Sequence, residues 1–124
     1  MIEPVTTRLG ELHGRDAIYL DDEKFDSTEK LLRLVGEVNG DLCSEQVSGQ
    51  FVPYEAKFIA VTELKKIELD EWMSLDKPFV HDTSSFYYFM ENGVKSYVFQ
   101  TYDWVFEIRC ESYEINFGKV MAKD

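Results

Sequence analysis

Hydrophobic and polar side chains alternate with a period of two along residues 54–64, and this pattern constrains the fold more than any other. One face would carry Tyr54, Ala56, Phe58, Ala60, Thr62 and Leu64, and the other Glu55, Lys57, Ile59, Val61 and Glu63. Aromatic and β-branched residues in such an alternation predict a β-strand. Because the alternation continues through Ile67 and Leu69, we expect either one long strand or a strand broken at Lys65 and Lys66.

A second alternating region covers residues 95–117 and predicts two further strands. Its hydrophobic positions are Tyr97, Phe99, Trp104, Phe106, Ile108, Cys110, Tyr113, Ile115 and Phe117. Residues 101–103 separate the two strands, and this length suits a hairpin connection. Asp103 favours a turn because its side chain can hydrogen-bond to its own backbone. We expect the second strand to be long and to contain a bulge near residues 111–112.

Residues 30–38 are compatible with either a helix or a strand. A helix capped by Asp26 or Ser27 would gather leucine and valine side chains on one side. A strand would alternate leucine and valine with charged residues and would end at a turn-forming Asn-Gly pair. We favour the strand, because Gly36 weakens a helix and valine favours a sheet.

The remaining elements are short. Residues 17–20 suggest a strand that the following acidic run ends, residues 85–91 suggest a helix capped by residues 81–84, and residues 69–75 suggest one helical turn. The total is five or six strands and one or two short helices. This composition predicts an α+β fold, mainly an antiparallel sheet, rather than repeated βαβ units. With 124 residues, we expect a single domain covering residues 1–124.

The acidic excess limits the partners of the chain. Its 24 acidic and 13 basic side chains give a formal net charge of −11. Such a surface disfavours nonspecific binding to nucleic acid and to anionic membranes, which both need basic patches. No apolar stretch approaches the roughly 18 residues of a membrane span and no export signal is visible. We therefore expect a cytoplasmic protein in which Cys43 and Cys110 are reduced.

No group of residues predicts catalysis, a metal or a cofactor. The acidic side chains form two runs that we expect to be solvated turns or loops: Asp21, Asp22, Glu23 and Asp26, then Glu68, Asp70, Glu71 and Asp76. Neither run has the spacing of a calcium-binding loop. Residues 81–85 predict a helix cap rather than a nucleophile with its base, since adjacent side chains diverge. His13, Cys43, His81 and Cys110 lack the paired spacing of zinc ligands.

Aromatic side chains are concentrated enough to suggest a binding surface. Residues 86–89 are four consecutive aromatic rings. On the expected helix, the two phenylalanines would face the core and leave Tyr87 and Tyr88 near the rim. Tyr102 and Trp104 flank the expected hairpin turn, and partly exposed tyrosine and tryptophan make good anchors for a partner.

The charge and the aromatic residues support three hypotheses about function, with enzymatic activity the least favoured. We favour a small acidic interaction protein, similar in physical character to an immunity protein or an inhibitor, with a basic protein partner. The second hypothesis is a small-molecule-binding domain with a pocket between the sheet and the helix at 85–91. The third is a homodimer formed through a weakly charged sheet edge at 95–101.

The candidate binding residues are Tyr87, Tyr88, Tyr102, Asp103, Trp104 and Arg109. Arg109 is included because it stands among acidic residues on a polar strand face. A cross-strand ion pair is the simplest interpretation of Arg109, and recognition of an anion is the alternative.

Overall fold

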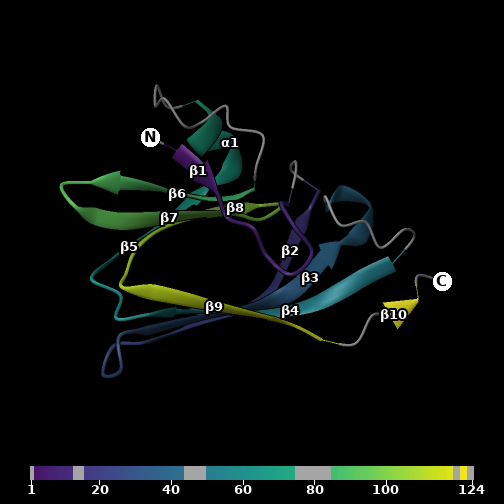
Figure 1. Cartoon of the computed structure of the whole chain (residues 1–124), viewed down its shortest axis with the longest axis horizontal. Coiled ribbons are helices and arrows are strands. Elements are labelled where there is room, and N and C mark those ends of the chain that lie inside the picture. Colours follow the sequence, from purple (N-terminus) through teal and green to yellow (C-terminus); the bar gives the residue numbers. More distant parts are fainter. Residues whose placement is uncertain (1, 13–15, 44–49, 75–84, 119–120, 123–124) are drawn as a thin grey trace.

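In a computed structural model, the described part of the chain forms two five-stranded antiparallel sheets that pack face to face (Figure 1). The structure describes residues 2–12, 16–43, 50–74, 85–118 and 121–122. The strands of sheet 1 follow the order β1 (Ile2–Pro4), β6 (Phe86–Glu91), β7 (Val94–Gln100), β8 (Trp104–Arg109) and β5 (Glu63–Glu68). A helix, α1 (Leu69–Met73), follows β5, and a 3-10 turn, η1 (Gly40–Leu42), follows the third strand.

Sheet 2 is built around β4 (Gln50–Ile59). On one side β4 pairs with β3 (Leu31–Asn39), which in turn pairs with the outermost strand β2 (Ile18–Asp26). On its other side β4 pairs with β9 (Ser112–Phe117) and with the two-residue β10 (Met121–Ala122).

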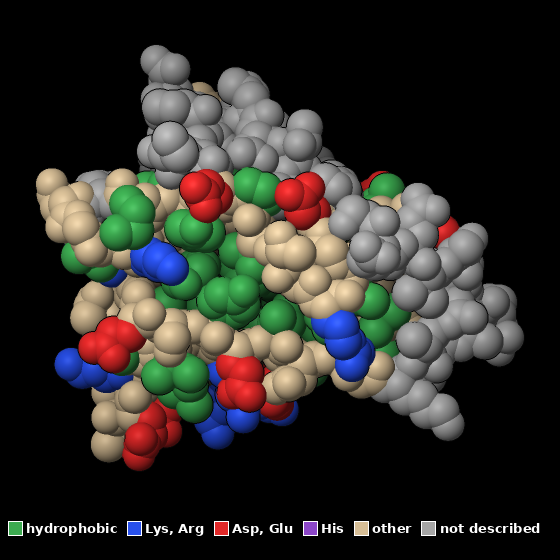
Figure 2. Space-filling view, in the orientation of Figure 1, with side chains coloured by type: hydrophobic (Ala, Val, Ile, Leu, Met, Phe, Trp, Pro, Cys, Tyr) green, Lys and Arg blue, Asp and Glu red, His purple; other side chains and the backbone are tan. Residues whose placement is uncertain are grey.

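The main hydrophobic core lies between the two sheets. Every second residue of β3 and β4 faces it, and the facing strands of sheet 1 contribute Phe86, Tyr97, Phe99, Phe106 and Ile108. Phe58 is fully buried, and its ring centroid lies 6.0 Å from that of Phe99 and 6.1 Å from that of Phe86. Figure 2 shows hydrophobic side chains gathered between the two layers on the viewed face. The alternation in sheet 2 therefore fixes the register of its strands against the core.

A second, smaller core covers the outer face of sheet 1. It consists of Leu69, Trp72, Tyr87, Phe89, Val98 and Val105, with Ile67 packed against it. Trp72 in α1 is fully buried there. The central part of sheet 1 is thus buried on both faces, which explains why residues 96–99 of β7 are buried without alternation.

The antiparallel, β-rich character of the fold agrees with the prediction, but the residues that the structure describes form ten strands instead of five or six. The strand preferred at residues 30–38 is confirmed as β3, and the helical turn near residues 69–75 is confirmed as α1. The helix predicted at 85–91 is wrong, because this segment is β6. Asn92 and Gly93 have φ angles of 53° and 79°, which suit a tight hairpin turn between β6 and β7 rather than a helix end.

The two long alternating regions are each divided between the sheets. The first one breaks at Ala60, where φ is 58°, and not at Lys65 and Lys66. The second one breaks at residues 110–111, so that β8 belongs to sheet 1 and β9 to sheet 2. These breaks lie side by side, since the Glu111 N–H donates to the Ile59 carbonyl at 3.0 Å. The alternation of hydrophobic and polar residues therefore continues through the positions at which the chain passes from one sheet to the other.

The structure also bears on the predictions about a sheet edge, the two cysteines and a membrane span. Strand β7 lies between β6 and β8, so the strand expected to form a sheet edge at 95–101 is paired on both sides. Cys43 and Cys110 are buried free thiols. Among the described residues, no helix has the length and apolar character that crossing a membrane requires. His13 and the cap at 81–84 lie outside the described residues.

Candidate functional site

A bulge in β2 shapes the first acidic run. The strand was expected to end at Leu20, but it continues through the acidic residues that follow. Leu20 pairs with Gly36 and Asp22 pairs with Val35, so Asp21 is an extra residue without an opposite partner in β3. This run is therefore a bulged edge strand, and not the loop that its composition predicted.

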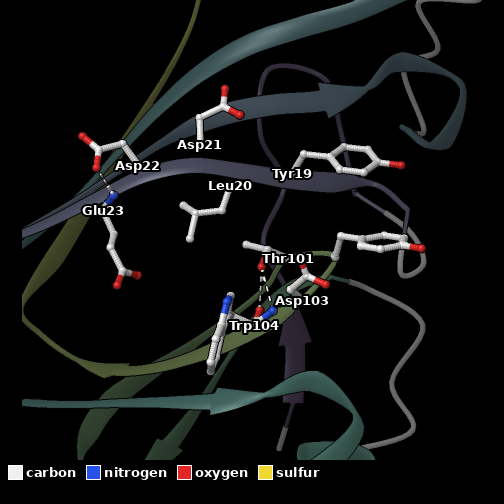
Figure 3. A pocket seen from close by; sticks show the side chains of 9 residues that line it. Tyr19, Leu20, Asp21, Asp22, Glu23, Thr101, Asp103 and Trp104 are labelled. Atoms are coloured by element: carbon white, nitrogen blue, oxygen red, sulfur yellow. Dashed lines mark hydrogen bonds between the residues drawn. The ribbon is translucent and has the colours of Figure 1, made fainter.

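The bulge decides which way the side chains of β2 point. Figure 3 shows Leu20 and Glu23 on the side of β2 where Trp104 lies, whereas Asp21 and Asp22 point to the opposite side. Without the extra residue, strict alternation would send Leu20 and Glu23 to opposite faces. The bulge thus turns one carboxylate, that of Glu23, inward next to a core leucine.

The turn between β7 and β8 supplies the aromatic side of the site. The Thr101 N–H and Oγ1 both donate to the Trp104 carbonyl, at 2.7 and 2.8 Å, and Oγ1 accepts from the Trp104 N–H at 3.0 Å. The Tyr102 N–H donates to the Ile18 carbonyl at 2.8 Å. The rings of Tyr102 and Tyr19 stack with centroids 5.5 Å apart. These contacts tie the turn of sheet 1 to the first residues of β2 in sheet 2.

Two neighbouring pockets share Asp103 and Trp104, and we call them together the Trp104 cleft. The first has a volume of about 370 Å³ and is lined by Tyr19, Leu20, Asp21, Asp22, Glu23, Thr101, Tyr102, Asp103 and Trp104 (Figure 3). The second has a volume of about 330 Å³ and adds Glu68 and Asp70. The Leu69 N–H donates to the Asp103 carbonyl at 2.9 Å, which holds the start of α1 beside the turn.

Both acidic runs of the sequence therefore contribute to one cleft. The side chains of Asp21, Glu68 and Asp103 make no hydrogen bond or ion pair with any residue in the described part of the chain. No three His, Cys, Asp or Glu side chains among the described residues are grouped so that they could hold a metal ion. The negative charge is spread along the cleft walls around an indole ring.

Lys66 already places a cation at this cleft. Its Nζ lies 2.7 Å from Glu23 Oε1 and 4.2 Å from the centroid of the Trp104 ring. An ammonium over an indole face at this distance makes a cation–π interaction. Lys66 faces the interior because it pairs with the buried Phe106 of β8. An ammonium group is thus held between a carboxylate and an aromatic ring.

Two tyrosines are held in their protonated form: Tyr19, which lines the cleft, and Tyr54, which contacts it from the core. The Tyr54 hydroxyl donates to the Tyr19 carbonyl at 3.0 Å. Burial, together with the negative charge of Asp21, raises the pKa of Tyr54 well above its ordinary value. Burial also raises the pKa of Tyr19, and nearby Asp16 and Tyr102 add to this effect. Both hydroxyls are therefore hydrogen-bond donors at neutral pH.

Three of the six predicted binding residues lie together in the Trp104 cleft. These are Tyr102, Asp103 and Trp104, which sit at the hairpin turn as expected. The other three lie elsewhere in the fold.

Tyr87 is fully buried in the core beneath α1, so the rim position predicted for it is wrong. Tyr88 lies on the opposite face of β6, where its hydroxyl donates to Glu3 Oε2 at 2.6 Å. Arg109 lies directly opposite Glu63 of β5, with Nη1 3.7 Å from Glu63 Oε2. This position confirms the cross-strand ion pair as the simplest account of Arg109.

The sequence pattern did not identify several residues of the cleft as binding residues. Tyr19 had no distinguishing signal, and Glu23 and Glu68 were noticed only as members of acidic runs. Lys66 was considered only as a strand break. Comparisons with protein families, with curated proteins and with solved structures gave no match for this chain.

Proposed function

We propose that this chain is a binding protein that receives basic side chains of a protein partner in the Trp104 cleft. The observation that carries the proposal is the meeting of two acidic runs, distant in sequence, around one partly exposed indole ring. Such a partner would be an enzyme or toxin with a basic surface, and the chain would act as its inhibitor or immunity protein.

The chemistry of the cleft suits lysine or arginine better than a neutral group. Carboxylates attract a basic partner over long range and speed the encounter. The face of Trp104 then offers a cation–π contact, as it already does for Lys66. Tyr102, 40% exposed and stacked on Tyr19, adds a rigid aromatic surface at the entrance.

A small organic cation is the second candidate ligand. The pocket first expected between the sheet and a helix at 85–91 does not form, because that segment is a strand of sheet 1. The cleft instead lies between β2, the β7–β8 turn and the start of α1, and its first pocket, of about 370 Å³, has the size of a small ligand site.

The test is a titration with a short arginine-rich peptide, followed by backbone amide shifts and by tryptophan fluorescence. We expect the largest shifts at residues 101–104 and near Glu68. Asp103→Asn and Glu68→Gln should each weaken binding about two- to fivefold, the range of a single exposed ion pair. Glu114→Gln is the matched control, because Glu114 is an exposed carboxylate on the outer face of β9.

The control separates a specific site from general attraction to an acidic surface. Equal weakening by Glu114→Gln and by the cleft variants would contradict the proposal. Retained binding of small ammonium compounds without binding of the peptide would favour the second candidate. Binding should also weaken strongly with added salt, since exposed charges are screened.

A further inference from the structure

A further pocket opens between the inner faces of β2 and β5, next to the Trp104 cleft. We call it the β2–β5 pocket; it is lined by Glu23, Lys24, Phe25, Leu32, Leu64, Lys66 and Phe106. Its volume of about 160 Å³ is close to that of an engineered apolar cavity of roughly 150 Å³ that binds benzene. One aromatic ring or one leucine side chain would fit.

Phe25 is exposed although it points toward the inside of the fold. It pairs with Leu32, which is 2% exposed in the main core, so both side chains lie on the inner face of sheet 2. Phe25 is nevertheless 44% exposed, because β2 is the outermost strand of its sheet. A further strand beside β2 would cover it.

The outer edge of β2 has backbone groups that such a strand could use. In an antiparallel edge strand, the N–H and C=O groups of every second residue point away from the paired strand and can pair with a further strand. Glu23 and Phe25 lie two residues apart, so their backbone groups point to the same side of β2. The Glu23 N–H also donates to its neighbour Asp22 Oδ1 at 2.9 Å. No strand in the described part of the chain pairs with this edge.

The charge of the outer edge of β2 determines which kind of strand could pair with it. The edge carries Asp21, Asp22, Glu23 and Asp26 against the single Lys24. Pairing with β2 of a second copy would set like charges against each other, which is unfavourable. A basic extended segment has the complementary charge.

We infer that an extended segment of the basic partner adds to the outer edge of β2, with a basic and an apolar side chain two residues apart facing inward. This inference rests on the proposed function, since it states how the partner of the Trp104 cleft is held. Inward side chains on a strand recur about every 6.6–6.8 Å, which is also the spacing from Glu23 to Phe25. The basic side chain reaches Glu23 and Trp104, where it displaces Lys66, and the apolar one fills the β2–β5 pocket.

Two capped heptapeptides of equal composition test this geometry. Thr-Thr-Lys-Thr-Phe-Thr-Thr has the proposed spacing, and Thr-Thr-Lys-Phe-Thr-Thr-Thr places the two side chains on opposite faces. We expect the first to bind about five- to tenfold more tightly, from partial burial of one aromatic side chain against Phe25. It should also slow hydrogen exchange at the outward-pointing amides of β2, which alternate along the strand.

Variants of the full chain make the test specific. Phe25→Ala should remove the preference for the first peptide, while Ile59→Ala, which trims an equally exposed side chain on β4, should leave it unchanged. Lys66→Ala should strengthen binding of the first peptide about two- to fivefold, because a competing ammonium is gone. Folding of each variant is checked by its amide spectrum.

Each outcome decides between the proposals. If an arginine-rich peptide binds the cleft but the two heptapeptides bind equally and protect no β2 amide, strand addition is wrong and the proposed function stands. If no basic peptide binds at all, both fail. If Lys66→Ala self-associates in light scattering and does not bind the heptapeptide, Lys66 serves only to protect the edge and the inference is overturned.

Discussion

Gly36 lies opposite the bulge of β2, and we predict that Gly36→Ala lowers the free energy of unfolding by about 3–5 kcal/mol. A Cβ atom on Gly36 would lie 1.9 Å from the Tyr19 carbonyl oxygen and 2.9 Å from its carbonyl carbon. Real Cβ atoms essentially never approach another atom within 3.0 Å, so β2 and β3 would have to separate by about 1 Å. The obstacle is backbone and not a side chain that can rotate away.

The magnitude follows from what the separation would break. Inserting a methyl group into a packed site costs about 1–3 kcal/mol. Moving Tyr19 also strains the hydrogen bonds from Tyr54 to Tyr19 and from Tyr102 to Ile18, each worth about 0.5–1.5 kcal/mol. Because a domain of this kind has only about 5–15 kcal/mol in total, the variant should lose a large part of its stability.

Urea denaturation followed by circular dichroism measures this loss, and two other glycines provide controls. Gly118→Ala places its Cβ 3.3 Å from the Cβ of Pro53, a side-chain contact that can relax, so we expect a loss below about 1 kcal/mol. Gly93→Ala meets no atom within 4 Å but has a φ of +79°, which costs about 1–2 kcal/mol. If Gly36→Ala unfolds at the same urea concentration as Gly118→Ala, the pairing of β2 with β3 is not the one described.

Three further measurements probe the core and its ionisable groups. Phe58→Ala should lower the unfolding free energy by about 3–5 kcal/mol because Phe58 is fully buried, whereas Phe25→Ala should lower it by less than about 1 kcal/mol. Burial raises the pKa of Cys43, and raises that of Cys110 to about 11, so both thiols should react with Ellman's reagent only after unfolding; fast reaction of the native protein would contradict their burial. Burial raises the pKa of Tyr97 from 10.0 to about 12, so the folded state holds this proton more tightly than the unfolded chain does. The contribution of Tyr97 to stability is therefore intact below pH 10 and should be lost as the pH rises from 10 to 12, which urea denaturation at alkaline pH would show.

The strands of sheet 2 could be predicted because water covers their outer face. Along β3, buried and half-buried residues alternate without interruption from Leu31 to Asn39. In such a strand every second residue faces the core and is usually hydrophobic, so the sequence shows which residues are buried. The same argument located β4, whose inner residues Tyr54 and Phe58 are buried.

Strands β6 and β7 have no such signal, because their central residues are buried on both faces of sheet 1. Phe86 and Tyr88 face the core between the sheets, whereas Tyr87 and Phe89 face the smaller core under α1. Four aromatic residues in a row are therefore a strand with two covered faces. A short apolar run cannot be distinguished by periodicity from a buried helix, and this ambiguity produced the wrong helix at 85–91.

Only the local half of the Trp104 cleft could be predicted. Tyr102, Asp103 and Trp104 are neighbours in a hairpin turn, and turn chemistry is visible over a few residues. The opposite walls depend on topology, because β2 and β5 are the edge strands on the same side of two different sheets. Nothing within the runs around Glu23 and Glu68 indicates that the fold brings them together.

The distribution of charge is what distinguishes the cleft from an ordinary acidic surface. On the outer face of sheet 2, Arg33 Nε lies 2.6 Å from Glu55 Oε2, and this hydrogen bond lowers the pKa of Glu55. At the Trp104 cleft, by contrast, the described ion pair is the one between Lys66 and Glu23, while Asp103 and other carboxylates stand near the same ring. Like charges gathered close together weaken a fold, and charge needed only for solubility would be better dispersed. Their concentration beside an aromatic face that already holds an ammonium group therefore supports the proposal of a site for cations between β2, the β7–β8 turn and the start of α1.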